Sequence, residues 1–483
     1  MASDEAGQCP PSEGSDTSHH PWKQAHAPHT EGEKSVNTKL KRIRSMSKSN
    51  KNLQFTSVYH LVSGVDQLRA SYHALDGRKA VGVDGQTKEE YGENLEENLQ
   101  DLSNRLNRFG YRPKPARRTW IEKPGKAEKR PLAISCFEDK IVQHALRDVL
   151  EAIFEPSFLR VSYGYRNGKS VVQCVDDIGR CIQKRKINWI LEADIRKFFD
   201  RMNHDWLLKF IGHRVADPRI VRLLTRLLRS GIMEDGLVSP NEEGAPQGSI
   251  LSPLLSNIYL HYVLDLWFDR EIKHGLKGEG WLFRYADDFI ICLQNKQEAE
   301  EVMSELKERL GKFSLQLADE KTRRVRFGRF EAENARRQNR KPGSFEFLGF
   351  RFVCGCTHKG YFKVKRRTSG KRLRKSLNEL KCWLDEQYAK MRKGELIRAV
   401  VEKVRGHLGH FAITDNLRQC STYLFRAAKL LFKALSRKSQ RRPYTWKGFK
   451  DALKHNAWPK AKLIHNINPC RQTWKQLTLK GGM

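Results

Sequence analysis

Two adjacent aspartates, Asp287 and Asp288, interrupt a run of apolar and aromatic residues, F-R-Y-A-D-D-F-I-I-C at 283–292. Burying an unpaired carboxylate costs several kcal/mol, so the folded chain must expose both groups or pair them with a cation. Strand-like segments flank the pair, W-L-F-R-Y at 281–285 and F-I-I-C-L at 289–293. We therefore predict a tight β-hairpin that carries the two aspartates at its tip.

A third carboxylate, Asp194, ends another strand-like segment, W-I-L-E-A-D-I at 189–195. Acidic side chains at the ends of neighbouring strands can converge at one sheet edge. Phosphoryl transfer on nucleotides uses such a site, where two Mg²⁺ ions about 3.5–4 Å apart activate the attacking hydroxyl and stabilise the leaving oxygen. Mg²⁺ prefers hard oxygen ligands. A lone Asp-Asp pair can instead simply make the turn, so the residues alone leave both interpretations open.

The composition indicates the kind of partner. The chain has 483 residues, with 90 Lys and Arg against 56 Asp and Glu, a net charge of +34 that extends through the folded part. Such a chain attracts polyanions, and nucleic acid is the first candidate. The ten cysteines include no C-x-x-C pair, which favours reduced thiols in a cytoplasmic protein. No apolar run has membrane length, so no membrane partner is expected.

The residue pattern changes along the chain. Residues 1 to about 36 are rich in Ser, Pro, Gly, His and acids, which is typical of disorder, and a basic segment follows to 52. Strand-like segments then alternate with helical ones, such as 298–313, which predicts an α+β domain. Past about 370 the strand-like segments stop and helices with basic faces follow, which indicates a second type of domain.

A series of short blocks follows in chain order: A-V-G-V-D-G at 80–85, R-P-K-P-A-R-R-T-W-I-E-K-P-G-K-A-E-K-R-P-L at 112–132, S-Y-G-Y-R-N-G-K-S at 162–170, A-D-I-R-K-F-F-D at 193–200, G-A-P-Q-G-S-I-L-S-P-L-L-S-N-I-Y-L at 244–260, Y-A-D-D at 285–288, L-A-D-E-K-T at 317–322 and F-L-G-F at 347–350. Together they resemble the reverse transcriptases encoded by group II introns, also called intron maturases. The resemblance covers about 55 to 470.

The resemblance implies a right-hand polymerase, in which fingers, a palm with an antiparallel sheet flanked by helices, and a helical thumb precede an all-α maturase domain. The implied segments are a disordered and basic N-terminal tail (1–52), an N-terminal extension with the start of the fingers (53–115), fingers and palm (116–355), thumb (356–395), the RNA-binding maturase domain X (396–470) and a C-terminal tail (471–483).

The family's site residues carry over to matching positions. Asp194 and Asp287 are the implied metal ligands for two Mg²⁺ ions, with Asp288 in support. The implied nucleotide-binding residues are Lys123 and Arg130, which face the triphosphate, Phe199, which excludes ribonucleotides, Gln247 and Gly248, which lie beside the nascent base pair, and Lys321, which contacts phosphate or donates a proton to pyrophosphate.

Two further groups of residues are expected to contact nucleic acid. Phe347, Leu348 and Gly349 resemble the element that grips the primer end, although these aromatics suit a core equally well. Basic helices over 359–375, with Arg366 and Arg367, suit a thumb that clamps a template–primer duplex. The implied RNA-binding residues, Arg441, Arg442, Tyr444, Trp446 and Lys447, combine cations with aromatics; a solvated helix end is the alternative.

The C-terminal resemblance has matches and departures. It rests on R-G-H at 405–407, Asn416, S-Q-R-R at 439–442, T-W-K-G-F at 445–449 and I-H-N at 464–466. The family commonly has Y-Y-G-V-P-G-N where this chain has F-A-I-T-D-N at 411–416, and Glu122 replaces a common proline. Since no C-x-x-C pairs follow domain X, we expect no C-terminal DNA endonuclease domain and a primer from another source.

We therefore expect an RNA-directed DNA polymerase encoded by a group II intron, which binds the intron RNA, assists its splicing and copies it into DNA during intron mobility. The expected partners are the intron RNA, a DNA target and primer, and deoxynucleotides (dNTPs), at the nucleoid of a bacterial cytoplasm. Two alternatives stay open: a splicing cofactor with a silent polymerase site, and a related reverse transcriptase in antiphage defence or spacer acquisition. The sequence does not decide between monomer and dimer.

Overall fold

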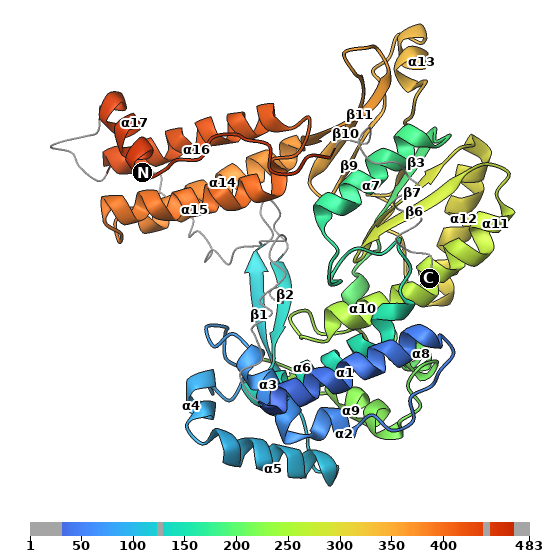
Figure 1. The fold of residues 1–483 in the computed structure, drawn as a ribbon, viewed down its shortest axis with the longest axis vertical. Helices are drawn as coiled ribbons and strands as arrows, with labels where there is room; N and C mark the ends of the chain where they lie inside the picture. Colours follow the sequence, from blue (N-terminus) through green and yellow to red (C-terminus); the bar gives the residue numbers. More distant parts are fainter. Residues whose placement is uncertain (1–30, 123–128, 438–444, 468–483) are drawn as a thin grey trace, which may run out of the picture.

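The computed structural model describes residues 31–122, 129–437 and 445–467. Within them helices surround three β-sheets (Figure 1), which confirms the predicted α+β class. The strands are β1 (Ala116–Glu122), β2 (Lys129–Ile134), β3 (Trp189–Ala193), β4 (Ile232–Glu234), β5 (Leu237–Ser239), β6 (Gly280–Tyr285), β7 (Asp288–Leu293), β8 (Arg323–Arg326), β9 (Ser344–Phe347), β10 (Phe350–Cys356) and β11 (Phe362–Thr368).

The helices connect these strands and form the rest of the fold. The α-helices are α1 (Glu31–Ser49), α2 (His60–Ser63), α3 (Val65–Ala74), α4 (Lys88–Gly92), α5 (Leu95–Asn107), α6 (Phe137–Phe154), α7 (Val171–Lys184), α8 (His204–Gly212), α9 (Pro218–Leu228), α10 (Ser252–Leu260), α11 (Lys273–Gly275), α12 (Lys296–Lys312), α13 (Glu331–Arg337), α14 (Gly370–Gln387), α15 (Lys393–Phe411), α16 (Leu417–Arg437) and α17 (Trp446–His455). Short 3₁₀ or π turns are η1 (Glu155–Ser157), η2 (Phe198–Asp200), η3 (His261–Asp265) and η4 (Phe268–Ile272). Within the described ranges no helix is both long and apolar enough to cross a membrane.

The sheet with the predicted hairpin has the strand order β6–β7–β3–β8, and each neighbouring pair is antiparallel. Both of its faces are buried. Leu191, Phe289 and Ile291 belong to one hydrophobic cluster with α10 and α12, whereas Ile190 and Ile290 belong to a second cluster with α7. Because side chains alternate between faces along a strand, the sheet needs an almost continuous apolar run to fill both clusters.

The N-terminal part is built around helix α6, which is buried along most of its length and packs against α1, α2 and α3. A second sheet adjoins it, with the order β2–β1–β4–β5. Strand β1 pairs antiparallel with β2 and parallel with β4. Strands β4 and β5 have three residues each and show no strand pattern by themselves.

Helix α1 corrects the predicted extent of the N-terminal tail. The sequence predicts a disordered and basic tail over 1–52, but Glu31–Ser49 form a helix that packs against α6. Val36, Leu40, Ile43 and Ser47 recur every three or four residues on its inner face, and the Ser47 hydroxyl donates to the carbonyl of Ile153. Cations on the other faces dominate the composition of this segment, so the helical spacing of its few inward-facing residues is hard to recognise in the sequence. Residues 1–30 lie outside the described part.

Beyond the third sheet, β11–β10–β9, helices α14, α15 and α16 pack together in Figure 1. Strand β11 ends at Thr368, and the described residues after it form helices and connecting loops, as predicted. Asn416 ties the two parts together, because its side chain accepts from the Thr368 amide (2.7 Å) and donates to the Thr368 hydroxyl (2.8 Å) and the Phe411 carbonyl (2.8 Å).

Arg366 is a correction to the predicted nucleic-acid contacts. The segment expected as basic helices includes strand β11, in which neighbouring side chains point to opposite faces. Arg366 is 0% exposed; its Nη1 lies 3.3 Å from Asp176 Oδ1, and its Nη2 donates to the Ile467 carbonyl at 3.0 Å. The prediction that Arg366 contacts primer or template is therefore wrong. The next residue, Arg367, is exposed.

This difference predicts unequal effects of two neighbouring substitutions. Arg366→Ala should lower the free energy of unfolding by roughly 3 kcal/mol, because Asp176 and the Ile467 carbonyl lose a buried partner. Arg367→Ala, the matched control, should change it by less than about 0.5 kcal/mol. Denaturant unfolding of both variants measures these values, and equally small effects would contradict the buried position of Arg366.

Candidate active site

The pairing of β3 with β7 brings the three predicted aspartates to one end of the sheet. Ala193 pairs with Phe289, so Asp194, the next residue of the antiparallel strand, stands level with Asp288. Tyr285 pairs with Asp288 across the β6–β7 hairpin, which leaves a two-residue turn. The predicted hairpin is therefore confirmed, and Asp194 lies beside its tip.

One cleft of about 360 Å³ opens at this end of the sheet. Its lining combines acids, cations and apolar groups from β2, β3, β7 and β9 and from the turns before β7 and β8 and after β3 and β9. The lining residues are Arg130, Glu192, Ala193, Asp194, Asp287, Asp288, Phe289, Lys321, Glu346, Phe347 and Leu348. Its volume lies in the range of small-molecule sites, so the cleft is large enough for a ligand.

The carboxylates in the cleft oppose one another's ionisation. Burial and the charge of Asp194 raise the pKa of Asp287 above its usual range. The side chain of Asp288 stays exposed at the cleft, where partial desolvation by the surrounding chain, followed by the charges of Asp287 and Asp194, raises its pKa to about 7. The hairpin tip therefore holds acidic groups whose charge the surrounding protein does not neutralise, which is a pattern typical of functional sites.

Lys321 compensates one of the three aspartates. Its Nζ forms a hydrogen-bonded ion pair with Asp194 Oδ2. Burial opposes the charge of Lys321, but the bond to Asp194 and the negative charges of Asp194 and Asp288 together outweigh it and raise the Lys321 pKa. The backbone amide of Ala318 donates to the Asp194 carbonyl at 2.8 Å, which holds the turn before Lys321 beside the end of β3.

The donor set suits a divalent cation. Mg²⁺ usually takes one or two protein carboxylates and completes its coordination with water and substrate phosphates. Asp287 and Asp288 offer hard oxygen ligands whose mutual repulsion a cation would relieve. Across 31–122, 129–437 and 445–467, no three His, Cys, Asp or Glu side chains form a complete metal-ligand set. Asp287 and Asp288 therefore suit a cation whose coordination water and substrate phosphates complete.

The predicted nucleotide contacts surround this cleft. Arg130 lies on β2, is exposed, and lines the cleft. Phe199 is half-buried, with its ring against the edge of Phe198 (centroids 5.4 Å apart), and Phe198 is a core residue. The Ala245 amide donates to the Phe199 carbonyl at 2.8 Å, so the loop that leads to Gln247 packs directly against Phe199.

The Gln247–Gly248 segment is seated on β2. The Ala133 amide donates to the Gln247 carbonyl at 2.7 Å. Gly248 has φ +111°, and a Cβ there would lie 2.6 Å from the Ala133 carbonyl oxygen, so this close approach requires glycine. The fold thus joins the loop with Gln247 to the strand with Arg130.

The other predicted contacts fall into three groups. Phe347 is buried and Leu348 half-buried, and both line the cleft, while Gly349 completes their turn at φ +80°. Arg367 lines a separate pocket with Asp415, Arg418, Gln419 and Thr422. Trp446 and Lys447 are exposed on α17, where Trp446 also packs against Phe432 and Phe449. Lys123, Arg441, Arg442 and Tyr444 lie outside the described residues.

Three residues at the site are absent from the sequence prediction. Glu192 lies two residues before Asp194, a spacing that places both on one face of an extended strand, and it accepts from Arg323 at 2.7 Å. Glu346 lines the cleft between the buried Phe345 and Phe347. Tyr165, which is 46% exposed, lies near the cleft, where partial desolvation and the charge of Asp287 raise its pKa. Strand alternation could have identified Glu192 and Glu346, but no local signal identifies Tyr165.

Comparisons with known proteins agree with this geometry. Residues 121–352, which include all three aspartates, match the family model for reverse transcriptase (RNA-dependent DNA polymerase). Group II intron-encoded protein LtrA of Lactococcus lactis subsp. cremoris is 31% identical over 340 residues, 59% of this chain and 56% of LtrA. Protein YkfC of Escherichia coli (strain K12) is 34% identical over 278 residues, 51% of this chain and 72% of YkfC. Nuclear intron maturase 4, mitochondrial, of Arabidopsis thaliana is 29% identical over 151 residues, 31% of this chain and 19% of that protein.

The match to LtrA spans about half of that protein's length, and the match to YkfC spans most of YkfC. Reverse transcriptases act on a nucleic-acid template with dNTPs and generally use divalent metal ions. With an RNA-dependent DNA polymerase domain over its acidic cleft and relatives that include group II intron-encoded proteins, this chain belongs to the reverse transcriptase family.

Proposed function

We propose that this protein is the RNA-directed DNA polymerase of a group II intron, which binds the intron RNA, assists its splicing and copies it into DNA during intron mobility. The observation that carries the proposal is the cleft in which Asp194 and the Asp287–Asp288 tip stand with Arg130 and Lys321. The similarity to LtrA supports the link to an intron, and the similarity to an intron maturase supports a role in splicing.

The chain's own residues divide the work of nucleotide transfer. Asp194 and Asp287 would hold two Mg²⁺ ions, with Asp288 in support. When bound, the metal supplies activation of the primer hydroxyl and stabilisation of the leaving pyrophosphate. Arg130 is placed to bind phosphate oxygens at the exposed side of the cleft. Lys321 holds Asp194 in place and carries a proton beside it.

The remaining parts of the fold suit the handling of nucleic acid. We assign 53–115 to the N-terminal extension and the start of the fingers, 116–355 to the fingers and palm, 356–395 to the thumb and 396–470 to maturase domain X. The net charge of +34 supports contacts with RNA and DNA phosphates. The site of action would be a bacterial cytoplasm, at the nucleoid.

Replacing both tip aspartates separates polymerase from splicing function. Asp287→Ala with Asp288→Ala should reduce DNA synthesis on an RNA template by more than about 100-fold, because the metal loses protein ligands. Splicing of the intron RNA should persist, since it depends on RNA binding. Primer extension and a splicing assay on one preparation measure both activities. Asp269→Ala, at an exposed aspartate, is the control; equal loss of splicing in a folded double variant would contradict the separation.

Phe199 provides a test of sugar selection. Phe199→Ala should raise the use of ribonucleotides relative to dNTPs by at least about 10-fold, because the bulky ring no longer excludes a 2′-hydroxyl. Phe199→Tyr keeps the bulk and should retain the discrimination. Steady-state primer extension with each nucleotide type measures the ratio. The same ratio in Phe199→Ala and the unmodified protein would remove this role.

Because the carboxylates in the cleft repel one another, a variant in which Asp288 is replaced by a neutral residue should be more stable, by an amount that depends on pH. The Asp288 pKa is raised from 3.8 to about 7, so ionisation destabilises the fold, fully above pH 7 and progressively less as the pH falls toward 4. In metal-free buffer at pH 8, Asp288→Asn should therefore raise the melting temperature by roughly 2 °C.

The same comparison at lower pH provides the control. The difference between Asp288→Asn and the unmodified protein should shrink toward pH 5, where Asp288 is already protonated. Added Mg²⁺ should stabilise the unmodified protein more than the variant. Thermal denaturation at the two pH values, with and without Mg²⁺, measures these differences. A variant that is less stable than the unmodified protein at pH 8 would contradict the repulsion.

A further inference from the structure

The turn that carries Asp287 has an unusual backbone. Ala286 has φ +56°, a left-handed conformation that a non-glycine residue keeps only where its surroundings hold it there. The carbonyl of Ala286 accepts a hydrogen bond from Nη1 of Arg284 at 3.0 Å. A side chain from the hairpin's own strand therefore caps the strained residue next to Asp287.

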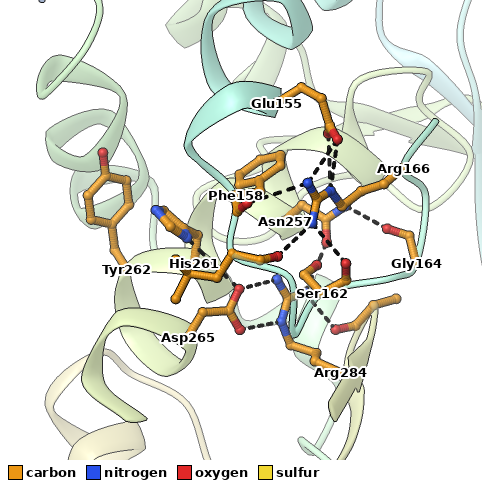
Figure 2. A network of polar contacts seen from close by, with 12 residues as sticks. Glu155, Phe158, Ser162, Gly164, Arg166, Asn257, His261, Tyr262, Asp265 and Arg284 are labelled. Carbon is orange, nitrogen blue, oxygen red and sulfur yellow. Dashed lines mark hydrogen bonds and ion pairs between the residues drawn. The ribbon is translucent and has the colours of Figure 1, made fainter. Parts of the chain in front are cut away.

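Arg284 is itself held rigidly. Both Arg284 and Asp265 are 0% exposed, and they form two parallel bonds, Nε to Oδ1 at 2.7 Å and Nη2 to Oδ2 at 2.6 Å (Figure 2). The nearby His261 does not hydrogen-bond Asp265, because its Nδ1 lies 4.0 Å from Asp265 Oδ2, and burial lowers its pKa to about 4. Such a fork fixes both the position and the plane of the guanidinium.

Asn257 links this fork to the other side of the turn. Its Oδ1 accepts from Arg284 Nη1 at 2.9 Å, and its Nδ2 donates to the Gly164 carbonyl at 2.8 Å (Figure 2). Gly164 in turn lies against Ala286, since a Cβ at position 164 would be 2.4 Å from the Ala286 nitrogen. Arg284, Asn257 and Gly164 thus enclose Ala286 from two sides.

The loop that presents Gly164 is anchored by its own charged pair. Arg166 Nη1 donates to the carbonyls of Leu159 (2.7 Å) and Ser162 (2.8 Å), and its guanidinium pairs with Glu155 (Figure 2). Backbone bonds join the loop to β6, from the Tyr163 amide to the Arg284 carbonyl and from the Arg284 amide to the Val161 carbonyl, both 2.8 Å. Gly164 therefore cannot withdraw from the turn without breaking these bonds.

We propose that Arg284, Asn257 and Gly164 form a positioning cradle that sets the two tip carboxylates, Asp287 and Asp288, at the distance from Asp194 that metal binding requires. The cradle rests on the proposed polymerase function. It gives a role to Gly164 and Asn257, which lie in the 162–170 and 244–260 blocks but do not line the cleft. A two-residue turn has few other ways to change, so loss of a cradle bond moves the carboxylates directly.

The test variant is Asn257→Ala, because it leaves the Arg284–Asp265 pair intact, whereas removing Arg284 would strand a buried charge. Its matched control is Asn416→Ala, which removes an equally buried asparagine far from the hairpin in the sequence. Two readouts are taken over a series of Mg²⁺ concentrations: the primer-extension rate at saturating dNTP, and the rise in melting temperature. Where the alanine variant is too unstable to purify, Asn257→Ser takes its place.

In Asn257→Ala the Mg²⁺ concentration for half-maximal rate should rise about 10-fold, as it does when a partner behind a metal ligand is lost. In Asn416→Ala it should stay within about twofold of the unmodified value, although both variants lose stability. An unchanged midpoint in Asn257→Ala, or an equal rise in both variants, would overturn the cradle. If the unmodified protein makes no DNA, the polymerase proposal fails, and the rise in melting temperature with Mg²⁺ alone decides about the cradle. A smaller rise in Asn257→Ala than in Asn416→Ala supports the cradle. An equal rise in the two variants overturns it.

Discussion

Repulsion among carboxylates at one end of a buried sheet is the interaction on which the structure of this site depends. Asp287 and Asp288 have raised pKa values because partial desolvation and neighbouring acids oppose their ionisation, while Asp194 is compensated by Lys321. A fold that left this end free to move would separate the charges. Here the antiparallel register of β3 and β7, with hydrophobic clusters on both faces of the sheet, keeps them together.

The interactions that hold these carboxylates together against their repulsion come from distant parts of the chain. Apolar side chains from α7, α10 and α12 secure the strands, the polar bonds of Arg284 and Asn257 secure the turn, and Arg130 brings positive charge from another sheet. Stability and reactivity therefore come from different residues. This arrangement lets the cleft keep uncompensated acids that a divalent cation would neutralise.

The sequence predicts the hairpin and the three aspartates because both depend on local patterns. Continuous apolar runs indicate the buried strands, and acidic residues at the ends of these runs indicate the site. Prediction from the sequence fails where tertiary packing decides. Arg366 looks like any cation in a basic segment, yet strand alternation turns it inward to Asp176. Helix α1 is hidden by its cations, and Tyr165 comes near Asp287 only through the folded loop that also presents Gly164. Arg284, likewise, is one of 90 cations until its bonds to Asp265 and Ala286 are seen.

The central claim is that Asp194 and the hairpin tip act as one metal site. The most direct measurement is anomalous scattering from crystals of the protein with an RNA–DNA duplex, a dNTP and Mn²⁺ in place of Mg²⁺. The account predicts Mn²⁺ peaks at coordination distance from both Asp194 and Asp287, with Lys321 released from Asp194. Mn²⁺ bound elsewhere, or carboxylates too far apart for one ion to bridge in the substrate complex, would contradict it.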